Sequence, residues 1–366
     1  MGKCYVVVGG QYGSEGKGKV VALLARYGAP FVVRCGGPNS GHTTNVNGRE
    51  VIVRQLPAGV ANPDSMLLVG AGCVVDEDLL LAEIEALGVT ASRVIVDPRA
   101  VLIEDSDRIA EAPNVFAIGS TASGTGAALV RRISRSNNVR LASGSTRLRA
   151  RVRVEPVAQI VHEALHGTND VIIEGTQGFG LSLLHGETYP FVTARDTTAS
   201  AFCSEVGISP RHVTDVLLVV RTYPIRVGGN SGPFPNEVTW ETVRAESRAP
   251  EVVPEYTSVT HRLRRVARFD IDLVKKACRY NAPTRLAVMG IDRLDHINEG
   301  AESAVQLSRI ARNFVENLEK QTKVKVGFVG TGFRTYDAVD LDDPERKICD
   351  SQDIHAQAPV GVARLL

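Results

Sequence analysis

A glycine-rich loop directly after the first apolar segment constrains this chain more than any other feature. The segment Cys4–Val8 is apolar and β-branched, and the next eleven residues contain five glycines and two lysines before a helix-like stretch. A strand that ends in such a loop places backbone N–H groups and the positive end of a helix where phosphate groups bind. The spacing is not that of a Walker A motif, because Gln11 stands five residues before Gly16 and Gly18 follows Lys17, and it does not match the dinucleotide fingerprint. The loop therefore predicts phosphate binding; the alternative is a glycine-rich turn with incidental lysines.

The charge balance and the cysteine pattern exclude several classes of protein. The 366 residues include 42 Lys and Arg and 41 Asp and Glu, so no net field attracts nucleic acid or an anionic membrane surface. The six cysteines are scattered singly, without a CxxC pair or a secretory signal, which indicates reduced thiols. No apolar run approaches the roughly 20 residues that span a bilayer. We therefore expect a cytoplasmic protein with no nucleic-acid partner and no membrane partner.

Short apolar runs alternate with helix-like stretches along most of the chain. Such alternation predicts an α/β fold with a mainly parallel central sheet and helices on both of its faces. The predicted strands are Cys4–Val8, Phe31–Arg34, Met66–Val69, Val94–Val96, Val171–Ile173, Val216–Val220, Leu286–Met289 and Val324–Val329. The predicted helices are Lys17–Arg26, Asp76–Leu87, Val154–His166, Asp270–Tyr280 and Ala301–Lys320. No repeat or linker divides the chain, so we expect one elaborated domain over residues 1–335 and a peripheral tail over residues 336–366.

A second glycine-rich segment follows the second predicted strand. It reads Gly36-Gly37-Pro38-Asn39-Ser40-Gly41-His42-Thr43 and combines bare backbone with one amide and one imidazole. A lone histidine is usually structural, whereas a histidine among glycines at a strand end more often faces a ligand. We therefore expect His42 to take part in a binding site.

The stretch from Arg131 to Arg153 is rich in arginine and has little apolar periodicity. One interpretation is a solvated, mobile loop. The other is an anion-binding loop that becomes ordered when a ligand binds.

Several motifs, in one order along the chain, resemble those of the adenylosuccinate synthetase family. They are Gly9–Lys19, Gly36–Thr43, Ile118–Gly126, Glu174–Gly178, Tyr189–Thr193, Arg226–Gly228, Gly232–Pro235 and Thr260–Arg265. The resemblance covers residues 4–335, and so many motifs in sequence order make an accidental similarity implausible. The short chain and the sequence GTQGFGLSL from Gly175 onward resemble the archaeal-type members most.

The resemblance implies a nucleotide-dependent C–N ligase that requires Mg²⁺. Such an enzyme transfers the γ-phosphoryl group of a nucleoside triphosphate to O6 of a 6-oxopurine nucleotide, and the amine of aspartate then displaces phosphate from C6. Phosphoryl transfer depends on positioning and charge neutralisation, for which Mg²⁺, Lys17 and the loop amides are suited. By resemblance, the triphosphate contacts Gly13, Glu15, Gly16, Lys17, Gly18, Gly41, His42, Thr43, Asp292, Gly330, Thr331 and Gly332. By the same resemblance, Mg²⁺ is expected to bind at Ser14 and at the carbonyl of Gly41.

The same resemblance places the other substrates and the catalytic groups. The purine monophosphate is expected to contact Ser14, Asn39, Thr121, Arg131, Gln177, Thr193 and Val227. Arg131 would reach it from the neighbouring subunit of a homodimer, with Arg132 as its substitute. Thr260, Arg262 and Arg264 correspond to the loop that receives aspartate, where a guanidinium fork suits a dicarboxylate. The alternative interpretation of these arginines is a solvated helix start, and we favour ligand binding. The implied catalytic residues are Ser14, Lys17, His42 and Gln177.

Ser14 departs from the family pattern, in which an Asp at this position is the general base on N1 of the purine and a Mg²⁺ ligand. A general base contributes roughly 10² to 10⁴ in rate, so one interpretation is a catalytically inactive nucleotide-binding relative. The other is a changed substrate, because Ser leaves room beside N1 for a 2-amino group and its hydroxyl accepts a hydrogen bond from that amine. This pattern resembles the phage-encoded 2-aminoadenylosuccinate synthetases, which join aspartate to dGMP on the way to 2-aminoadenine DNA and would act in the host cytoplasm. We favour dGMP over IMP, which ordinary members use together with GTP.

Two further departures concern the donor nucleotide and the aspartate loop. Gly290 stands where the family has a Lys that packs over the guanine of GTP, whereas Asp292 matches the pattern. Loss of that side chain adds ATP and dATP to GTP as candidate donors. His261 stands where a glycine is usual, which restricts the backbone of the aspartate loop.

Overall fold

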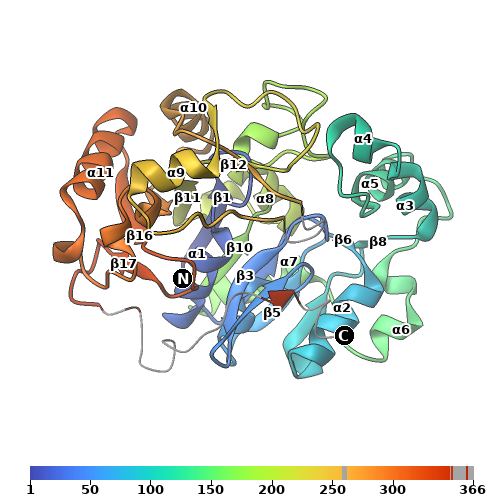
Figure 1. The fold of residues 1–366 in the computed structure, drawn as a ribbon. Coiled ribbons are helices and arrows are strands. Elements are labelled where there is room, and N and C mark those ends of the chain that lie inside the picture. Colours follow the sequence, from blue (N-terminus) through green and yellow to red (C-terminus); the bar gives the residue numbers. More distant parts are fainter. Residues whose placement is uncertain (258–261, 347, 349–359, 362–366) are drawn as a thin grey trace.

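A ten-stranded sheet runs across the centre of the molecule (Figure 1). The computed structural model describes residues 1–257, 262–346 and 348, together with the backbone of residues 360–361. In spatial order the strands are β17 (Ala338–Asp340), β16 (Lys325–Gly330), β15 (Arg285–Met289), β11 (Asp215–Arg221), β1 (Cys4–Gly9), β10 (Val171–Glu174), β2 (Phe31–Arg34), β5 (Met66–Val69), β7 (Val94–Val96) and β9 (Arg153–Val154). All neighbours are parallel except β16 and β17, which are antiparallel. The predicted α/β fold with a mainly parallel sheet is confirmed.

The central strands form because their side chains are apolar in both directions out of the sheet. Along β1, Cys4, Val6 and Val8 point to one face and Val7 points to the other, and all four are fully buried. Burial on both faces is what a continuous apolar run in a parallel sheet requires. All eight predicted strands occur in this sheet, and their ends agree with the structure to within one residue.

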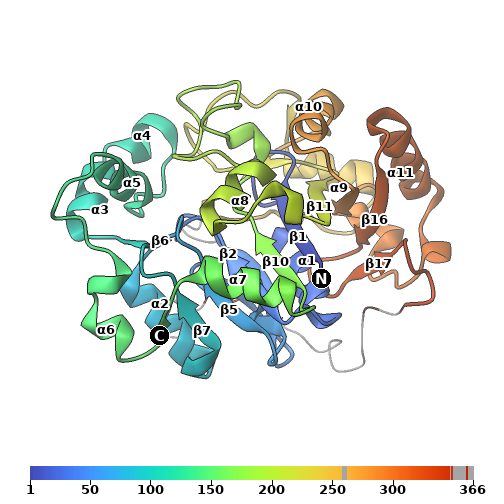
Figure 2. The same cartoon turned by 180° about the vertical axis from the view of Figure 1, so that it is seen from behind.

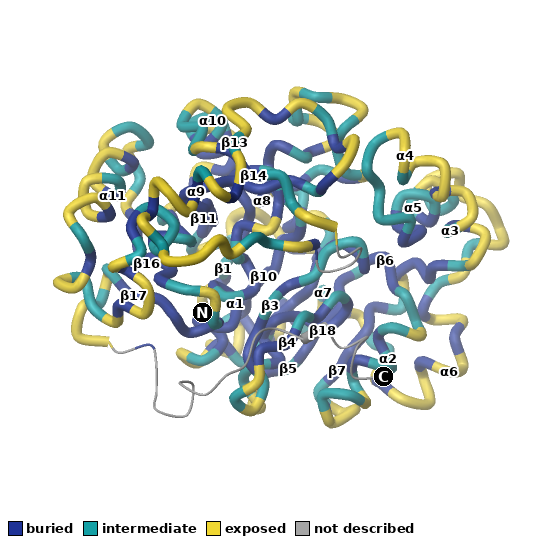
Figure 3. The backbone as a smooth tube through the Cα atoms, in the orientation of Figure 1, coloured by how far each residue is buried: buried dark blue, intermediate teal, exposed yellow. Residues whose placement is uncertain are grey.

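Helices cover both faces of the sheet (Figures 1 and 2). The helices are α1 (Lys17–Arg26), α2 (Glu77–Ala86), α3 (Asp105–Glu111), α4 (Asn114–Ile118), α5 (Thr125–Ile133), α6 (Thr146–Arg149), α7 (Val157–His166), α8 (Ala199–Val206), α9 (Trp240–Ser247), α10 (Ile271–Asn281) and α11 (Arg309–Thr322). Helices α7, α8, α10 and α11 share one apolar cluster with Val6 and Val8, whereas α1 packs with Val7 on the opposite face. Figure 3 shows the buried sheet inside a shell whose exposed residues lie on the outer helices and loops.

Smaller sheets and single turns complete the fold. One small sheet contains β12 (Ile225–Arg226), β14 (Arg265–Ala267) and β13 (Glu237–Val238). A second contains β18 (Val360–Gly361), β4 (Arg49–Val53) and β3 (His42–Val46), and a third contains β6 (Val74–Val75) and β8 (Val101–Leu102). The antiparallel pair β3 and β4 was not predicted, although Asn47 and Gly48 both have positive φ in the turn, as an Asn-Gly hairpin requires. Within the described part of the chain, no helix has the length and apolar character needed to cross a membrane.

Three predicted boundaries differ from the structure by three residues or more. The helix expected from Val154 begins at Val157, because Arg153–Val154 forms strand β9. The helix expected from Ala301 begins only at Arg309, because the hydroxyl of Ser308 caps it by accepting from the N–H of Ala311 at 3.2 Å. The sheet also extends past residue 335, where a peripheral tail was expected, since Ala338–Asp340 is buried and pairs with β16. These three residues belong to the core.

The arginine-rich stretch after α5 is built into the fold. It contains α6 and β9, and it buries Leu148. Arg131, Arg140, Arg147 and Arg153 are paired with carboxylates, as in Arg153 with Glu155 and Arg147 with Asp78. The interpretation as a solvated, mobile loop is therefore wrong for the part of this stretch that forms α6 and β9.

The parallel arrangement decides where the functional residues gather. The loops that follow β1, β2, β10, β11 and β15 all leave the sheet at the carboxyl ends of their strands. In open α/β sheets this edge is where ligands bind. Both glycine-rich loops of the sequence lie there.

The central strands should be the most sensitive part of the fold. Leu68 in β5 is fully buried within the cluster that α7 and α8 cover, whereas Leu184 is 70% exposed. We expect Leu68→Ala to lower the free energy of unfolding by about 2 to 5 kcal/mol. Leu184→Ala should change it by less than about 0.5 kcal/mol. Urea denaturation of both variants tests this, and equal effects would contradict the assignment of β5 to the core.

Candidate active site

The loop after β1 is folded around the buried carboxylate of Glu15. Its Oε1 accepts from the backbone N–H groups of Gln11 at 3.1 Å and Gly13 at 2.8 Å, and its Oε2 accepts from Nζ of Lys17 at 2.6 Å. Gly13 and Gly16 have φ angles of 84° and 102°, which favour glycine. The side chain of Glu15 therefore shapes the phosphate loop from inside.

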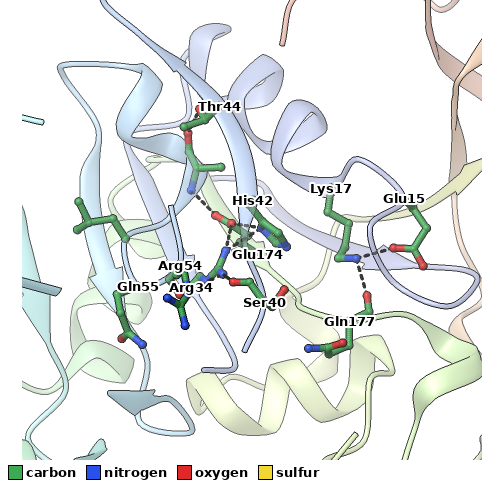
Figure 4. Close-up of polar contacts among 12 residues, drawn as sticks. Glu15, Lys17, Arg34, Ser40, His42, Thr44, Arg54, Gln55, Glu174 and Gln177 are labelled. Atoms are coloured by element: carbon green, nitrogen blue, oxygen red, sulfur yellow. Dashed lines mark hydrogen bonds and ion pairs between the residues drawn. The ribbon is translucent and has the colours of Figure 1, made fainter. Parts of the chain in front are cut away.

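Lys17 joins the phosphate loop to the loop after β10. Its ammonium is buried and donates to the carbonyl of Gln177 at 2.5 Å as well as to Glu15 (Figure 4). Gly18 brings a third segment close, since a Cβ there would lie 2.4 Å from the carbonyl oxygen of Thr43. Two predicted triphosphate residues, Gly18 of α1 and Thr43 of β3, thus lie against each other.

His42 lies in a buried network with Arg34 and Glu174 (Figure 4). Its Nδ1 contacts Glu174 Oε1 and lies 2.7 Å from Nη1 of Arg34, which itself donates to Glu174 Oε1 at 2.5 Å. The other oxygen of Glu174 accepts from the N–H of Ala58 at 2.7 Å. Nε2 of His42 is buried and has no hydrogen-bond partner among the described residues. A buried polar atom without a partner is costly, so this nitrogen is suited to meet a ligand.

The environment of His42 keeps its ring neutral near pH 7. Burial and the guanidinium of Arg34 lower the pKa of His42 to about 4, and the carboxylate of Glu174 offsets only part of this. Glu174 stays ionised, because the guanidinium of Arg34 and the hydrogen bonds from His42 and Ala58 outweigh the effect of burial and hold the pKa of Glu174 below its usual range.

A polar cleft beside these loops brings most of the predicted nucleotide residues together. Five of the seven residues expected at the purine monophosphate line it, namely Ser14, Asn39, Thr121, Gln177 and Val227. Gly13 and Gly41 of the predicted triphosphate set and Arg264 of the predicted aspartate set line it as well. None of the described residues that line this cleft is Asp or Glu.

Ser14 is exposed at the cleft and has a left-handed backbone, with φ of 56°. Non-glycine residues with positive φ are most often Asn or Asp, so the loop keeps a conformation that also suits an Asp. The carbonyl of Ser14 accepts from Nη1 of Arg221 at 3.2 Å. The hydroxyl of Ser14 and the carbonyl of Gly41 are neutral oxygens on one cleft, and they fit a Mg²⁺ ion that takes its remaining ligands from phosphates and water.

The residues expected at the donor nucleotide lie at the carboxyl ends of β15 and β16. Nζ of Lys19 donates to the carbonyl of Gly332 at 2.5 Å, which joins this region to the phosphate loop. Burial raises the pKa of Asp292, although Arg293 and Lys19 oppose this effect. Thr331 is buried and its hydroxyl donates to the carbonyl of Ala301, so this side chain is occupied within the protein.

The predicted aspartate residues are only partly described. Thr260 and His261 lie outside the described residues. Arg264 lines the cleft and burial lowers its pKa to about 10, whereas Arg262 is exposed and does not line the cleft.

Two predicted monophosphate residues do not line this cleft. The guanidinium of Arg131 pairs with Asp107 at 2.7 Å and with Glu104 at 3.1 Å, and it lines a separate cavity of about 590 Å³ between α3 and α5. This cavity is the larger one, but it contains none of the other candidate residues. Arg132, the proposed substitute for Arg131, donates to the carbonyl of Ala71. Thr193 lies next to the cleft, where its N–H donates to Leu181.

Sequence reasoning missed four charged residues that the site contains. Arg34 and Glu174 are the last residues of β2 and β10 and are paired in register. Arg221 is the last residue of β11, and it pairs with Glu255. Arg34, Glu174 and Arg221 could have been predicted, because each is a charged residue at the end of an otherwise apolar strand. Glu255 lies in a loop without such a signal.

A parallel α/β sheet that carries a phosphate loop, a buried histidine and a polar cleft at its carboxyl edge defines a nucleotide-binding enzyme of the phosphoryl-transfer class. The family model for adenylosuccinate synthetase matches residues 6–152 and 143–301. The adenylosuccinate synthetase of Methanocaldococcus jannaschii is 39% identical over 345 residues, which cover 92% of this chain and 96% of the relative. That of Thermococcus onnurineus is 39% identical over 350 residues, with 93% and 98% covered. The chain belongs to the adenylosuccinate synthetase family and is a C–N ligase.

Two solved structures share this fold. The succinoaminodeoxyadenylate synthetase of cyanophage S-2L, bound to dGMP and to dATP as an energy donor, has a TM-score of 0.78 and 29% identity, with 93% of this chain and 95% of that chain covered. The fully ligated adenylosuccinate synthetase of Plasmodium falciparum has a TM-score of 0.81 at 20% identity, with 93% and 100% covered, which shows the fold alone.

The buried neutral ring of His42 should make the protein sensitive to acid. Between pH 6.5 and 4 the unfolded chain binds a proton at His42 that the folded chain does not bind, so stability falls as pH decreases through this window. Between pH 7 and pH 5 this proton uptake lowers the free energy of unfolding by about 2 kcal/mol. Urea denaturation at both pH values should show a smaller loss in His42→Asn than in the wild type. His166→Asn, which changes an exposed ring, is the matched control, and equal losses in all three proteins would contradict the assignment.

Arg131 should act on stability in this chain, because its guanidinium is bound to Asp107 and Glu104. We expect Arg131→Ala to lower the free energy of unfolding by about 2 to 3 kcal/mol. Arg135→Ala removes an exposed arginine from the same segment and should have little effect on stability. An Arg131→Ala variant with unchanged stability and a raised KM for the purine monophosphate would instead support the role across a dimer that the resemblance implied.

Proposed function

We propose that this chain joins L-aspartate to C6 of a purine nucleoside monophosphate, with hydrolysis of a nucleoside triphosphate and through a 6-phosphoryl intermediate. The observation that carries the proposal is the cleft, where residues of the loops after β1, β2 and β10 meet Arg264. Phosphate-binding backbone, polar groups that can bind a purine and a guanidinium for a carboxylate are the three elements this reaction needs.

The residues divide the work according to their positions. The amides of the phosphate loop and Lys17 bind the triphosphate, and phosphate oxygens compete with Glu15 for the ammonium. His42 presents Nε2 to the transferred group, while Asn39 and Gln177 orient the purine. In the first step O6 bonds to the γ-phosphorus as the bond to the nucleoside diphosphate breaks, and the proton on N1 passes to water beside the exposed Ser14. In the second step the neutral amine of aspartate bonds to C6 as the C6–O6 bond breaks; phosphate leaves, and the attacking nitrogen releases one proton to water.

Mg²⁺ would be held by the carbonyl of Gly41 and the hydroxyl of Ser14 together with substrate phosphates. It would supply charge neutralisation on the phosphate oxygens. Because both protein ligands are neutral, binding of the ion depends on the nucleotide more than it would with an Asp at position 14.

Ser14 favours a purine with a 2-amino group, which makes dGMP the first candidate substrate. Ser is two side-chain heavy atoms smaller than Asp and carries no charge, and its hydroxyl accepts a hydrogen bond. The product would be 2-amino-2'-deoxy-N6-succinyladenylate, a precursor of 2-aminoadenine DNA. The cyanophage relative, whose solved structure contains dGMP and dATP, supports this proposal.

IMP with GTP is the second candidate, and the archaeal relatives favour it. They are adenylosuccinate synthetases with identities of 38 to 40% over more than nine-tenths of this chain, which exceeds the 29% identity to the cyanophage protein. Gly290 has a φ angle of 77° and offers no side chain to a donor base, so the donor stays open among ATP, dATP and GTP.

A single assay separates these candidates. Wild-type protein with Mg²⁺ and aspartate is given dGMP or IMP together with ATP, dATP or GTP, and phosphate release and the succinylated product are measured. We expect turnover of dGMP to exceed that of IMP, and Ser14→Asp to raise turnover of IMP by roughly 10² to 10⁴ because it supplies a general base. The left-handed backbone at position 14 accepts Asp, so this variant should fold.

The other outcomes are equally informative. Faster turnover of IMP by the wild type would exclude the dGMP assignment and leave an ordinary adenylosuccinate synthetase. No phosphate release with any combination would exclude ligase activity and identify an inactive nucleotide-binding relative.

A further inference from the structure

A partly buried ion pair between Arg221 and Glu255 connects the two loops that flank the cleft. Nη1 of Arg221 donates to Glu255 Oε2 at 3.1 Å, and Nη2 of Arg221 contacts Oε1 of the same carboxylate. The side chains are 10% and 29% exposed. The pair is bidentate, the arrangement with the greatest geometric specificity for Arg and a carboxylate.

Arg221 is fixed to the phosphate loop by three hydrogen bonds. The side-chain amide of Gln11 accepts from the N–H of Arg221 at 2.9 Å and donates to its carbonyl at 3.0 Å. The guanidinium then donates to the carbonyl of Ser14 at 3.2 Å. The position of Arg221 is therefore set by the same loop that presents Ser14 to the cleft.

Glu255 is fixed to the segment that carries the candidate aspartate residues. Its carbonyl accepts from the N–H of Arg264 at 2.8 Å, and Tyr256 forms a β-bridge with Leu263. The N–H of Thr257 donates to the carbonyl of Arg262 at 2.9 Å. These contacts make residues 255–257 and 262–264 one short ladder, so a displacement of Glu255 displaces Arg264.

Charge complementarity strengthens this link. Although burial opposes the ionised form of Glu255, the guanidinium groups of Arg221, Arg293 and Arg264 lower the pKa of its carboxyl to about 2. One fixed carboxylate thus neutralises Arg221 beside the cleft, while Arg264 still lines it.

We propose that Arg221 and Glu255 are positioning residues that hold the aspartate-receiving arginines at a fixed distance from Ser14. The inference rests on the proposed function, because it assumes that the dicarboxylate binds at Arg264. In this arrangement the amine of aspartate arrives at C6 of a purine that Ser14 contacts on the other side. Misplacement of a reacting group by about 1 Å costs on the order of a hundredfold in rate.

The test is a comparison of kinetic constants for all three substrates. Glu255→Gln keeps the shape of the side chain but removes the charge that binds Arg221. We expect the KM for aspartate to rise about ten- to a hundredfold and kcat to fall. The KM values for the purine monophosphate and the triphosphate should stay within about threefold of the wild type, because the phosphate loop keeps its contacts with Glu15.

Two further variants separate positioning from stability. Arg221→Gln/Glu255→Gln leaves no unpaired buried charge, so it should be more stable than Glu255→Gln and yet keep the raised KM for aspartate. Glu237→Gln is the matched control, because Glu237 forms a bidentate pair with Arg265 outside the cleft. It should leave all KM values unchanged.

The outcomes distinguish this inference from the proposed function. An active wild type whose KM for aspartate is unchanged in Glu255→Gln would overturn the positioning role. Equal increases in all three KM values, or a KM for aspartate that the double variant restores together with stability, would identify a purely structural pair. A wild type that neither turns over the substrates nor binds aspartate in calorimetry would instead remove the proposed function on which the inference rests.

Discussion

The buried carboxylate of Glu15 is the interaction on which the rest of the candidate site depends. It occupies two backbone donors of the phosphate loop and neutralises Lys17, so the loop holds its shape with a buried ammonium in place. A buried cation without such a partner would be strongly destabilising. Because Lys17 also donates to Gln177, the loop after β10 takes its position from the same carboxylate. Under the proposed function, an incoming phosphate meets an ammonium already in place and competes for it with Glu15 and with the carbonyl of Gln177.

The same type of ion pair occurs on both sides of this loop at the carboxyl edge of the sheet. An arginine ends a buried strand, and a glutamate from another segment neutralises it: Arg34 with Glu174 on one side, Arg221 with Glu255 on the other. The first pair fixes the ring of His42, and the second fixes the ladder that carries Arg264. Buried pairs of this kind contribute little net stability, because desolvation offsets their attraction. Their value here is geometric, since each pair ties a candidate site residue, His42 or Arg264, to a rigid strand end.

The sequence was sufficient for the parts of the molecule that local chemistry determines. Apolar β-branched runs specified the eight central strands, and motifs directly after strands specified Ser14, Asn39 and Gln177, because the carboxyl ends of parallel strands meet at one edge. The strands β9 and β17, with two and three residues, have no periodicity to detect. The inward position of Arg131 depends on carboxylates of α3, and that of Glu255 on a strand end 34 residues earlier. Such tertiary pairing cannot be inferred from spacing along the chain.

The choice between dGMP and IMP as the proposed substrate depends mainly on the side chain at position 14. Its left-handed backbone and its carbonyl contact with Arg221 are properties of the loop, and neither depends on what the side chain carries. The loop therefore accommodates Asp and Ser alike, while the described lining of the cleft contains no other carboxylate that could act as a base there. Three other candidate residues that line the cleft, Asn39, Gln177 and Arg264, lie on segments outside the phosphate loop. Under the proposed function, a change at position 14 alters the contact with N1 and C2 of the purine and leaves these three residues in place.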